Sequence, residues 1–193
     1  FPTRRSSDLE NVLHIPINHY FSIDMDAMKD LGDAVGGVTV DNAFAFDAEG
    51  IHYPKGKQHL GGWEALQYAR MRYEDPEGDY GRQRRQREVL IELTNKLLSF
   101  NSLLKYQEIL DVIGEHGETD LSFDQMMAML KKYTPALKTI ETDQLKGYDY
   151  TGDGVTGIEG ISYQLVEESE RQRVENAIKE QMNLSKKDTE QSQ

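Results

Sequence analysis

Arginine is concentrated in one short part of this sequence, YARMRYEDPEGDYGRQRRQ, which runs from Tyr68 to Gln86. Six arginines lie between residues 70 and 87, although the whole chain carries a formal net charge of −12. Arginine stays charged and presents a planar fork of donors, so several arginines around one site suit a phosphate or a pyrophosphate. The cluster therefore indicates the binding of a local anion.

A helix is expected from Gly81 to Leu98, and its apolar residues predict how the cluster is oriented. Helical spacing defines a buried stripe made of Val89, Leu90, Leu93 and Leu97. Projected at about 100° per residue, Arg82 and Gln86 fall on this stripe. A guanidinium that faces a core needs a partner, so Arg82 is expected to meet a carboxylate or a bound anion near the positive end of the helix dipole. The other arginines of the helix are expected on a solvated face: Arg84, Arg85 and Arg87.

Two more arginines, Arg70 and Arg72, precede this helix at a spacing of two. If the chain is extended there, both side chains point to one face and can converge with Arg82. The residues leave an alternative open, in which Asp75 and Asp79 simply pair with these arginines and Asp79 caps the helix. For the three arginines together, an anion site is the preferred interpretation.

Composition restricts the function classes. A sequence pI near 4.9 argues against general binding to nucleic acid or to an anionic membrane, because both need a positive field over the binding face. The absence of cysteine excludes disulfides and thiol catalysis. The sequence contains no apolar run of about 18 residues that could span a bilayer.

The two ends of the sequence differ from its middle. Residues 1–9, FPTRRSSDL, begin without methionine and resemble the translation of a sequencing-library adapter, so we interpret them as a non-native leader. Residues 185–193 are polar without periodicity and are expected to be disordered. Residues 10–184 are expected to form one domain.

The expected elements indicate an α/β fold. HYFSID predicts a strand, a helix capped by Asp24 follows it, and VTVDN returns as a strand. This order implies parallel pairing in a helix-covered sheet. The other expected segments are a loop over 44–57, the short helix GGWEALQYA, helices over 103–113, 122–132 and 169–184, a helical turn near Pro135, and strands over 144–150 and 161–166.

Other motifs carry weaker signals. DYTGDGVTGIEG resembles a calcium loop in its first six positions, but glycine occupies its ninth and twelfth positions, so a turn between two strands is the better interpretation. The five histidines are scattered, and no metal ligand is predicted among them. The methionines at 126, 127 and 129 are interpreted as core filler.

ALQYARMR followed by GDYGRQRRQ resembles the signature of the LytR-CpsA-Psr family of cell-wall enzymes. The segments HIPINHYFSIDMDAMKDLGDAVGGVTVDN and LGGWEALQY are similar to the family's preceding blocks. The resemblance covers about residues 10–184, which would be the C-terminal part of the transferase domain. It implies a three-layer α/β/α sandwich with a mixed central sheet, here truncated at its N-terminal side.

The resemblance also implies an activity and a location. Family members transfer an anionic glycopolymer, such as a teichoic acid or a capsule polymer, from an undecaprenyl diphosphate lipid to peptidoglycan, and they form a phosphodiester. They are held by an N-terminal membrane helix at the outer face of the cytoplasmic membrane, mostly in Gram-positive bacteria. This chain lacks that helix and would be soluble by itself.

Carried over by position, the resemblance assigns residues to roles. Arg70, Arg72, Arg82 and Gln86 match positions that bind pyrophosphate, and Asp79 matches an acid that orients the arginines, so the expected catalytic group is Arg70, Arg72, Asp79 and Arg82. Mg²⁺ is expected to assist, with its ligands in an upstream block that this sequence lacks, and the chain alone is expected to be inactive. A noncatalytic module that binds a polyprenyl phosphate or an anionic polymer is the alternative. A transcription regulator is disfavoured, since the sequence shows no basic recognition helix.

Overall fold

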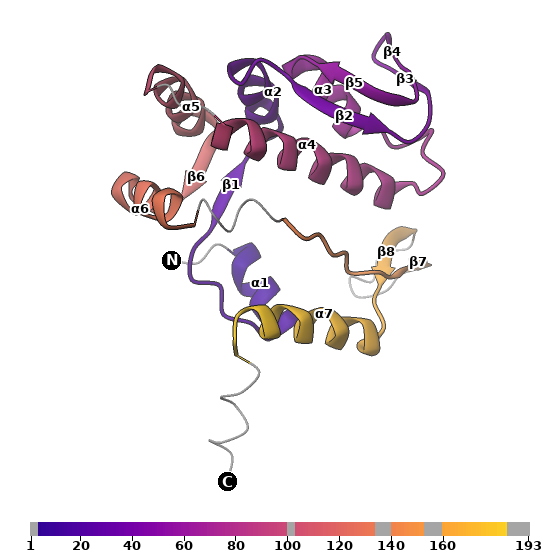
Figure 1. Cartoon of the computed structure of the whole chain (residues 1–193). Helices are drawn as coiled ribbons and strands as arrows, with labels where there is room; N and C mark the ends of the chain where they lie inside the picture. Colours follow the sequence, from indigo (N-terminus) through magenta and orange to yellow (C-terminus); the bar gives the residue numbers. More distant parts are fainter. Residues whose placement is uncertain (1–3, 100–102, 134–139, 153–159, 185–193) are drawn as a thin grey trace. The chain divides into compact units, whose positions relative to one another are not determined.

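The structure is a computed structural model that describes residues 4–99, 103–133, 140–152 and 160–184 (Figure 1). The chain divides into two compact units: one combines residues 1–20 with 141–193, and the other covers residues 21–140. Helices and strands alternate along the chain, and the α/β class expected from the sequence is confirmed.

The unit of residues 21–140 carries the arginine cluster. Its elements along the chain are β1 Phe21–Ile23, α2 Met25–Ala34, β2 Val38–Asn42, β3 Phe46–Ala48, β4 Ile51–Tyr53, β5 Gly56–Leu60, α3 Gly62–Arg70, α4 Asp79–Ser99, α5 Leu103–His116, β6 Gly117–Thr119 and α6 Phe123–Tyr133. All helices expected from the sequence in this unit are present, except that the turn near Pro135 lies outside the described residues.

Every strand pair that the structure describes is antiparallel. β1 pairs with β6, β2 pairs with β5, and β3 pairs with β4. The parallel pairing expected across α2 is therefore wrong, because β1 and β2 each pair with a strand that comes later in the chain. The loop expected over 44–57 is also wrong: Gly50 and Pro54 occupy tight turns between short strands rather than one long loop.

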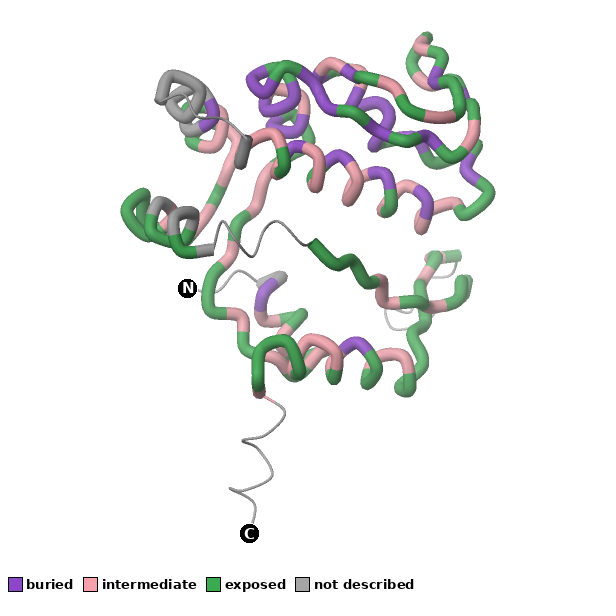
Figure 2. The backbone as a smooth tube through the Cα atoms, in the orientation of Figure 1, coloured by how far each residue is buried: buried purple, intermediate pink, exposed green. Residues whose placement is uncertain are grey.

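The core of this unit lies between β2 and the helices α2, α3 and α4. Val38 and Val40 of β2 are buried, whereas Thr39 and Asp41 between and after them are exposed, as expected for a strand with one buried face. Figure 2 shows buried segments gathered on α2, β2 and α3 and along α4. The buried apolar side chains form one cluster, which includes Met28, Leu31, Val35, Val38, Val40, Phe46, Tyr53, Leu60, Ala65, Tyr68, Ala69, Met71, Val89, Leu93 and Ile109.

Two glycines allow α2 and α3 to lie close together. A Cβ on Gly62 would lie 2.0 Å from the carbonyl oxygen of Lys29, and a Cβ on Gly32 would lie 2.8 Å from the Cα of Gly62. Neither position can carry a side chain without moving a helix. This contact fixes α3, which ends at Arg70, against the core.

The methionines of α6 are not all core residues. Met129 is 43% exposed, so its interpretation as core filler is wrong. The expected cap of α6 is confirmed, because the Ser122 hydroxyl accepts a hydrogen bond from the Gln125 N–H and the Gln125 side chain accepts one from the Ser122 N–H.

The other unit contains α1 Arg4–Leu13, β7 Tyr148–Gly152, β8 Ile161–Leu165 and α7 Glu168–Gln181. α7 contacts α1 through Arg171, which donates to the carbonyl oxygen of Val12 at 3.0 Å and pairs with Glu175 at 2.5 Å. Residues 4–9, interpreted from the sequence as a leader, belong to α1. β7 and β8 pair in antiparallel fashion. The turn predicted at DYTGDGVTGIEG falls on residues 153–159, which lie outside the described residues, as does the tail 185–193.

Among the helices that the structure describes, none is long and apolar enough to cross a membrane.

Asp24 and His116 link the start of α2 to the end of α5. Asp24 caps α2 as expected, since its carboxylate accepts a hydrogen bond from the Ala27 N–H at 2.8 Å. The His116 ring lies 3.3 Å from Asp24 Oδ2 and 3.1 Å from Asp30 Oδ2. The hydrogen bond with Asp24, more than the neighbouring charges, raises the pKa of His116 above its usual value.

This contact predicts a pH-dependent stability. A raised pKa in the folded state means that protonated His116 stabilises the fold below the unfolded pKa of about 6.5, and that this contribution is lost as pH rises through the folded pKa. His116→Gln should therefore lower the urea midpoint at pH 6 and make less difference at pH 8. An equal loss at both values would show that His116 contributes only packing.

Candidate active site

A buried ion pair joins α4 to the loop between α3 and α4. The side chains of Arg85 and Asp75 are 2% and 1% exposed. Arg85 donates to the Asp75 carboxylate and to the carbonyl oxygen of Met71, and its Nε donates to the carbonyl oxygen of Tyr68 at 3.0 Å. The guanidinium is thus held by one carboxylate and by the backbone at the end of α3.

Aromatic rings complete the environment of Arg85. Its guanidinium carbon lies 5.5 Å from the centre of the Phe46 ring and 5.9 Å from that of Tyr68, within the range of cation–π attraction. The Tyr68 hydroxyl donates to Glu88 at 2.9 Å. Burial, followed by the Glu88 charge, raises the pKa of Tyr68 above its usual value.

Asp75 also organises the loop around it. Its carboxylate accepts a hydrogen bond from the Glu77 N–H at 2.7 Å, and its carbonyl oxygen accepts one from the Gly78 N–H at 2.9 Å. A Cβ on Gly81 would lie 1.8 Å from Asp75 Oδ2, so only glycine leaves room for this carboxylate. The loop between α3 and α4 therefore packs onto the first turns of α4 by placing the Asp75 carboxylate against Gly81.

The buried face of α4 differs from the expected one. Arg85, Val89 and Leu93 are 2%, 0% and 3% exposed, whereas Leu90 is 40% exposed. Placing Arg85 on a solvated face and Leu90 in the buried stripe was therefore wrong, and Arg82 and Gln86 lie beside the buried face rather than on it. The reason is that Asp75 and two carbonyl groups satisfy a charge that hydrophobic periodicity alone assigns to solvent.

Asp79, the first residue of α4, brings two of the predicted arginines together. Its Oδ1 lies 2.6 Å from a terminal nitrogen of Arg82 and 3.7 Å from the Nε of Arg72. Its Oδ2 accepts a hydrogen bond from Gln83 at 2.9 Å. The arrangement fits the expectation that Asp79 orients arginines, and it also contains the direct pairing that the sequence left open as an alternative.

Asp79 and Arg82 each keep a buried polar atom without a hydrogen bond. These atoms are Asp79 Oδ1 and Arg82 Nε, which form no hydrogen bond with the described residues although the two side chains form a short ion pair. Gln86 lies one turn after Arg82 on α4, partly buried. Arg82 and Gln86 thus keep donors that a phosphate oxygen could accept from.

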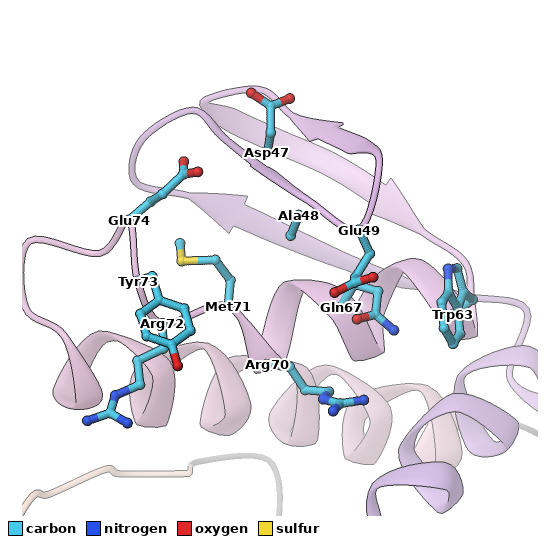
Figure 3. Close-up of a pocket in the computed structure, with 10 residues that line it drawn as sticks. All are labelled: Asp47, Ala48, Glu49, Trp63, Gln67, Arg70, Met71, Arg72, Tyr73 and Glu74. Atoms are coloured by element: carbon cyan, nitrogen blue, oxygen red, sulfur yellow. The ribbon is translucent and has the colours of Figure 1, made fainter.

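Arg70 lies apart from this group. It is the last residue of α3, so the extended geometry that would place it on one face with Arg72 does not apply. Figure 3 shows the two guanidinium groups pointing in different directions. Arg70 is exposed and makes no ion pair with any residue that the structure describes.

A hollow of about 610 Å³ lies in front of Arg70 (Figure 3). Sequence reasoning missed it, because its walls come from α3, from the β3–β4 hairpin and from the segment after α3. Its lining residues are Asp47, Ala48, Glu49, Trp63, Gln67, Arg70, Met71, Arg72, Tyr73 and Glu74. Both arginines that precede α4 therefore border one open space.

Arg84 and Arg87, the other two arginines of α4, were expected to face solvent. Arg84 pairs with Glu77 at 2.5 Å, and both side chains are about half exposed, at 45% and 55%. Arg87 is only partly buried. The expectation that these two arginines lie on a solvated face agrees with the structure for Arg84 and in part for Arg87.

The described residues do not supply a metal site. Within the described ranges, no three histidine or acidic side chains gather in a way that could hold an ion. The expected Mg²⁺ therefore has no ligand set among the described residues.

Comparisons with known proteins identify relatives of the whole segment. The sequence profile of the LytR_cpsA_psr family matches residues 4–180. The polyisoprenyl-teichoic acid–peptidoglycan teichoic acid transferase TagU of Enterococcus faecalis is 47% identical over 175 residues, which are 91% of this chain and 56% of that protein. TagU of Bacillus mycoides is 41% identical over 178 residues, 92% of this chain and 57% of that protein. The chain spans a little more than half the length of these relatives.

Solved structures agree with the sequence relatives. A crystal structure described as a transcriptional regulator from Enterococcus faecalis has a TM-score of 0.79 and 43% identity, and the match covers 93% of this chain and 64% of that one. The crystal structure of Bacillus subtilis TagU has a TM-score of 0.67 and 32% identity, with 91% and 69% of the two chains covered. The resemblance noted in the sequence is confirmed at the level of the family.

The buried ion pair predicts that removing either of two carboxylates in the same loop has very different effects on the free energy of unfolding. Asp75→Ala leaves Arg85 charged inside the core and should lower the free energy of unfolding by about 3 to 5 kcal/mol. Glu77→Ala removes the exposed partner of Arg84 and should change it by less than about 1 kcal/mol. Urea denaturation of the two variants compares them directly, and equal effects would contradict the assigned role of Asp75.

Proposed function

The chain belongs to the LytR_cpsA_psr family, and on this premise we propose that it serves the transfer of an anionic glycopolymer to peptidoglycan, with Arg72, Asp79 and Arg82 at the site that receives the donor's pyrophosphate. The donor is an undecaprenyl diphosphate lipid that carries a teichoic acid or capsule-like polymer. The relatives named for teichoic acid transfer support this choice of polymer class.

One observation carries the assignment of the site. Two arginines share Asp79 at the first turn of α4, and Arg82 retains a buried Nε that forms no hydrogen bond with the described residues. The N-terminal end of a helix favours an anion through its free N–H groups and its dipole. A diphosphate oxygen at this position would satisfy Arg82 and share the charge of Arg72.

The reaction needs charge neutralisation more than covalent catalysis by the protein. An acceptor hydroxyl oxygen forms a bond to the phosphorus that carries the glycopolymer and loses its proton to water. The bridging phosphorus–oxygen bond breaks, and undecaprenyl monophosphate leaves with the bridging oxygen. Negative charge develops on the leaving phosphate. Arg72 and Arg82 stabilise that charge, and Asp79 keeps their guanidinium groups in place.

Arg70 and Gln86 extend the site in two directions. Gln86 lies one helical turn beyond Arg82 and is proposed to donate to the same diphosphate. Arg70 borders the hollow in front of α3 and is proposed to contact the phosphate nearest the acceptor. Mg²⁺ would need ligands outside the described residues, and there it would add positive charge at the diphosphate. We place the native protein at the outer face of the cytoplasmic membrane of a Gram-positive bacterium, anchored by a helix outside this segment.

Two lipids that differ only in the pyrophosphate group test whether the site recognises phosphate. Calorimetry should show that this chain binds a short polyprenyl pyrophosphate and fails to bind the polyprenyl alcohol of the same length, because the arginines recognise phosphate. Arg82→Ala and Arg72→Ala should each weaken pyrophosphate binding by about 2 kcal/mol or more. Equal affinity for the pyrophosphate and the alcohol would rule out phosphate recognition.

Two control substitutions separate specific contacts from a diffuse positive field. Arg84→Ala and Arg87→Ala remove charges from the same helix and should change affinity only a few-fold, or by less than about 1 kcal/mol. Arg82→Lys keeps the charge but loses the planar fork, and it should remain impaired. If all four arginine variants weakened binding equally and salt reproduced the loss, the specific roles would be wrong.

Turnover distinguishes transfer from binding alone. In a version of the protein extended to the length of its relatives, Arg82→Ala should abolish release of polyprenyl monophosphate from a lipid-linked polymer in the presence of peptidoglycan. A parent protein that binds the pyrophosphate but never releases monophosphate would instead be the noncatalytic binding module.

A further inference from the structure

We propose that His116 is a pH-operated latch, which holds the junction of α5 and β6 against the start of α2 and lets this junction open locally when the imidazole loses its proton. The latch lies outside the proposed diphosphate site, because it shares no residue with that site. Each of the two can therefore be tested, and can fail, without the other.

Both ring nitrogens of His116 face a carboxylate. Nδ1 lies 3.3 Å from Asp24 Oδ2, and Nε2 lies 3.1 Å from Asp30 Oδ2. A neutral imidazole carries a single N–H, so one of its nitrogens would direct a lone pair at a carboxylate. Only the protonated ring can donate to both acids. The geometry therefore selects the charged form of His116.

The two acids keep their charge in the range where a histidine titrates. The hydrogen bond from the Ala27 N–H lowers the pKa of Asp24, and the hydrogen bond from Lys29 lowers the pKa of Asp30. Both carboxylates are thus ionised at every pH at which the imidazole changes its protonation state. Within this cluster, His116 is the group whose charge changes.

The surroundings of the ring favour its proton. The hydrogen bond with Asp24 raises the pKa of His116, and it outweighs the opposing effect of burial. The latch is therefore closed below the unfolded pKa and opens as pH rises through the folded pKa. The charged groups on the elements around the ring are mostly acidic: Asp24, Asp26, Lys29, Asp30 and Asp33 at α2 and its cap, Glu115 on α5 and Glu118 on β6.

Two glycines make the junction a hinge. Gly114 lies in the last turn of α5, and Gly117 is the first residue of β6, so they flank His116. A Cβ on Gly117 would lie 2.5 Å from the carbonyl oxygen of Ile113, and a larger residue would therefore block this sharp turn from helix to strand. Glycine at both positions lowers the cost of changing the backbone angles there.

The ladder beyond the hinge is short. β6 pairs with β1 over three residues on each strand (Figure 1). The Asp24 N–H donates to the His116 carbonyl oxygen at 3.3 Å, next to this ladder. A two-stranded ladder of this length is at best marginally stable by itself. Contacts made by the His116 side chain are thus needed to keep β6 in place.

The body of α5 is held independently of the latch. Ile109 is 5% exposed and belongs to the core cluster, and Val112 and Ile113 pack against that cluster. Burial of these apolar side chains does not depend on pH. Loss of the proton from His116 should therefore release β6 while α5 stays in place.

Native-state hydrogen exchange on the 193-residue chain measures this opening directly. Between about pH 5.5 and about pH 8.5, and after correction for intrinsic exchange rates, protection of the Asp24 amide and of the β1–β6 ladder should fall several-fold. Protection of the β2–β5 ladder should remain, which also shows that the unit is still folded.

Four substitutions assign the effect to the latch. His116→Gln should leave protection at the Asp24 amide low and independent of pH, because glutamine stays neutral. His116→Arg has a permanent charge and two donor directions, so it should keep protection at the higher pH. Asp30→Asn removes one charge without touching the α2 cap and should reduce the pH effect. His59→Gln removes an exposed histidine of β5 and should leave the pH effect unchanged.

Three results would overturn the latch. The first is protection at the Asp24 amide that does not change with pH in the parent. The second is a pH effect that persists in His116→Gln. The third is an equal loss of protection in the β2–β5 ladder, because the whole unit would then unfold instead of opening at the junction.

Discussion

The structure around the site depends on one buried ion pair, between Arg85 and Asp75. Burying two charges is costly, and the cost is offset only because the guanidinium also donates to the Tyr68 and Met71 carbonyl groups. The pair therefore connects three parts of the chain: the end of α3, the loop after it, and the first turns of α4. Gly81 allows the contact, since any larger residue would collide with the carboxylate.

The Arg85–Asp75 ion pair positions the more exposed residues Arg72, Asp79 and Arg82. The loop that Asp75 organises leads directly to Asp79, which lies beside Arg72 and Arg82. The C-terminal end of α3 and the residue after it supply the two carbonyl groups to the pair, and the same helix borders the hollow. Buried charge thus serves positioning, while the arginines that remain outside the core keep donors for a ligand. The acidic net charge of the chain is compatible with an anion site because the positive groups are local.

The sequence predicted most helices and the closeness of Asp79 to Arg72 and Arg82, but not the strand pairing or the inward face of α4. Helices followed from caps such as Asp24 and Ser122 and from local periodicity, which depend on neighbours in sequence. Pairing of β2 with β5 depends on contacts far apart in the chain, so the local strand–helix–strand order gave the wrong partner. Arg85 was misplaced because its partner is outside the helix. A usable signal existed: Gly81, Arg85, Val89 and Leu93 recur every four residues, and an acid precedes them at Asp75.

We propose that the buried pair positions the arginines assigned above to phosphate binding, and an isosteric change tests this role most directly. Asp75→Asn keeps the shape of the side chain but removes its charge, and hydrogen exchange can follow the Glu77 and Gly78 amides while calorimetry follows pyrophosphate binding to the same sample. In a variant that remains folded by circular dichroism, we expect faster exchange at these amides together with an affinity loss of about tenfold or more, although Arg72, Asp79 and Arg82 are unchanged. Unchanged affinity in a variant whose loop amides exchange freely would contradict the claim.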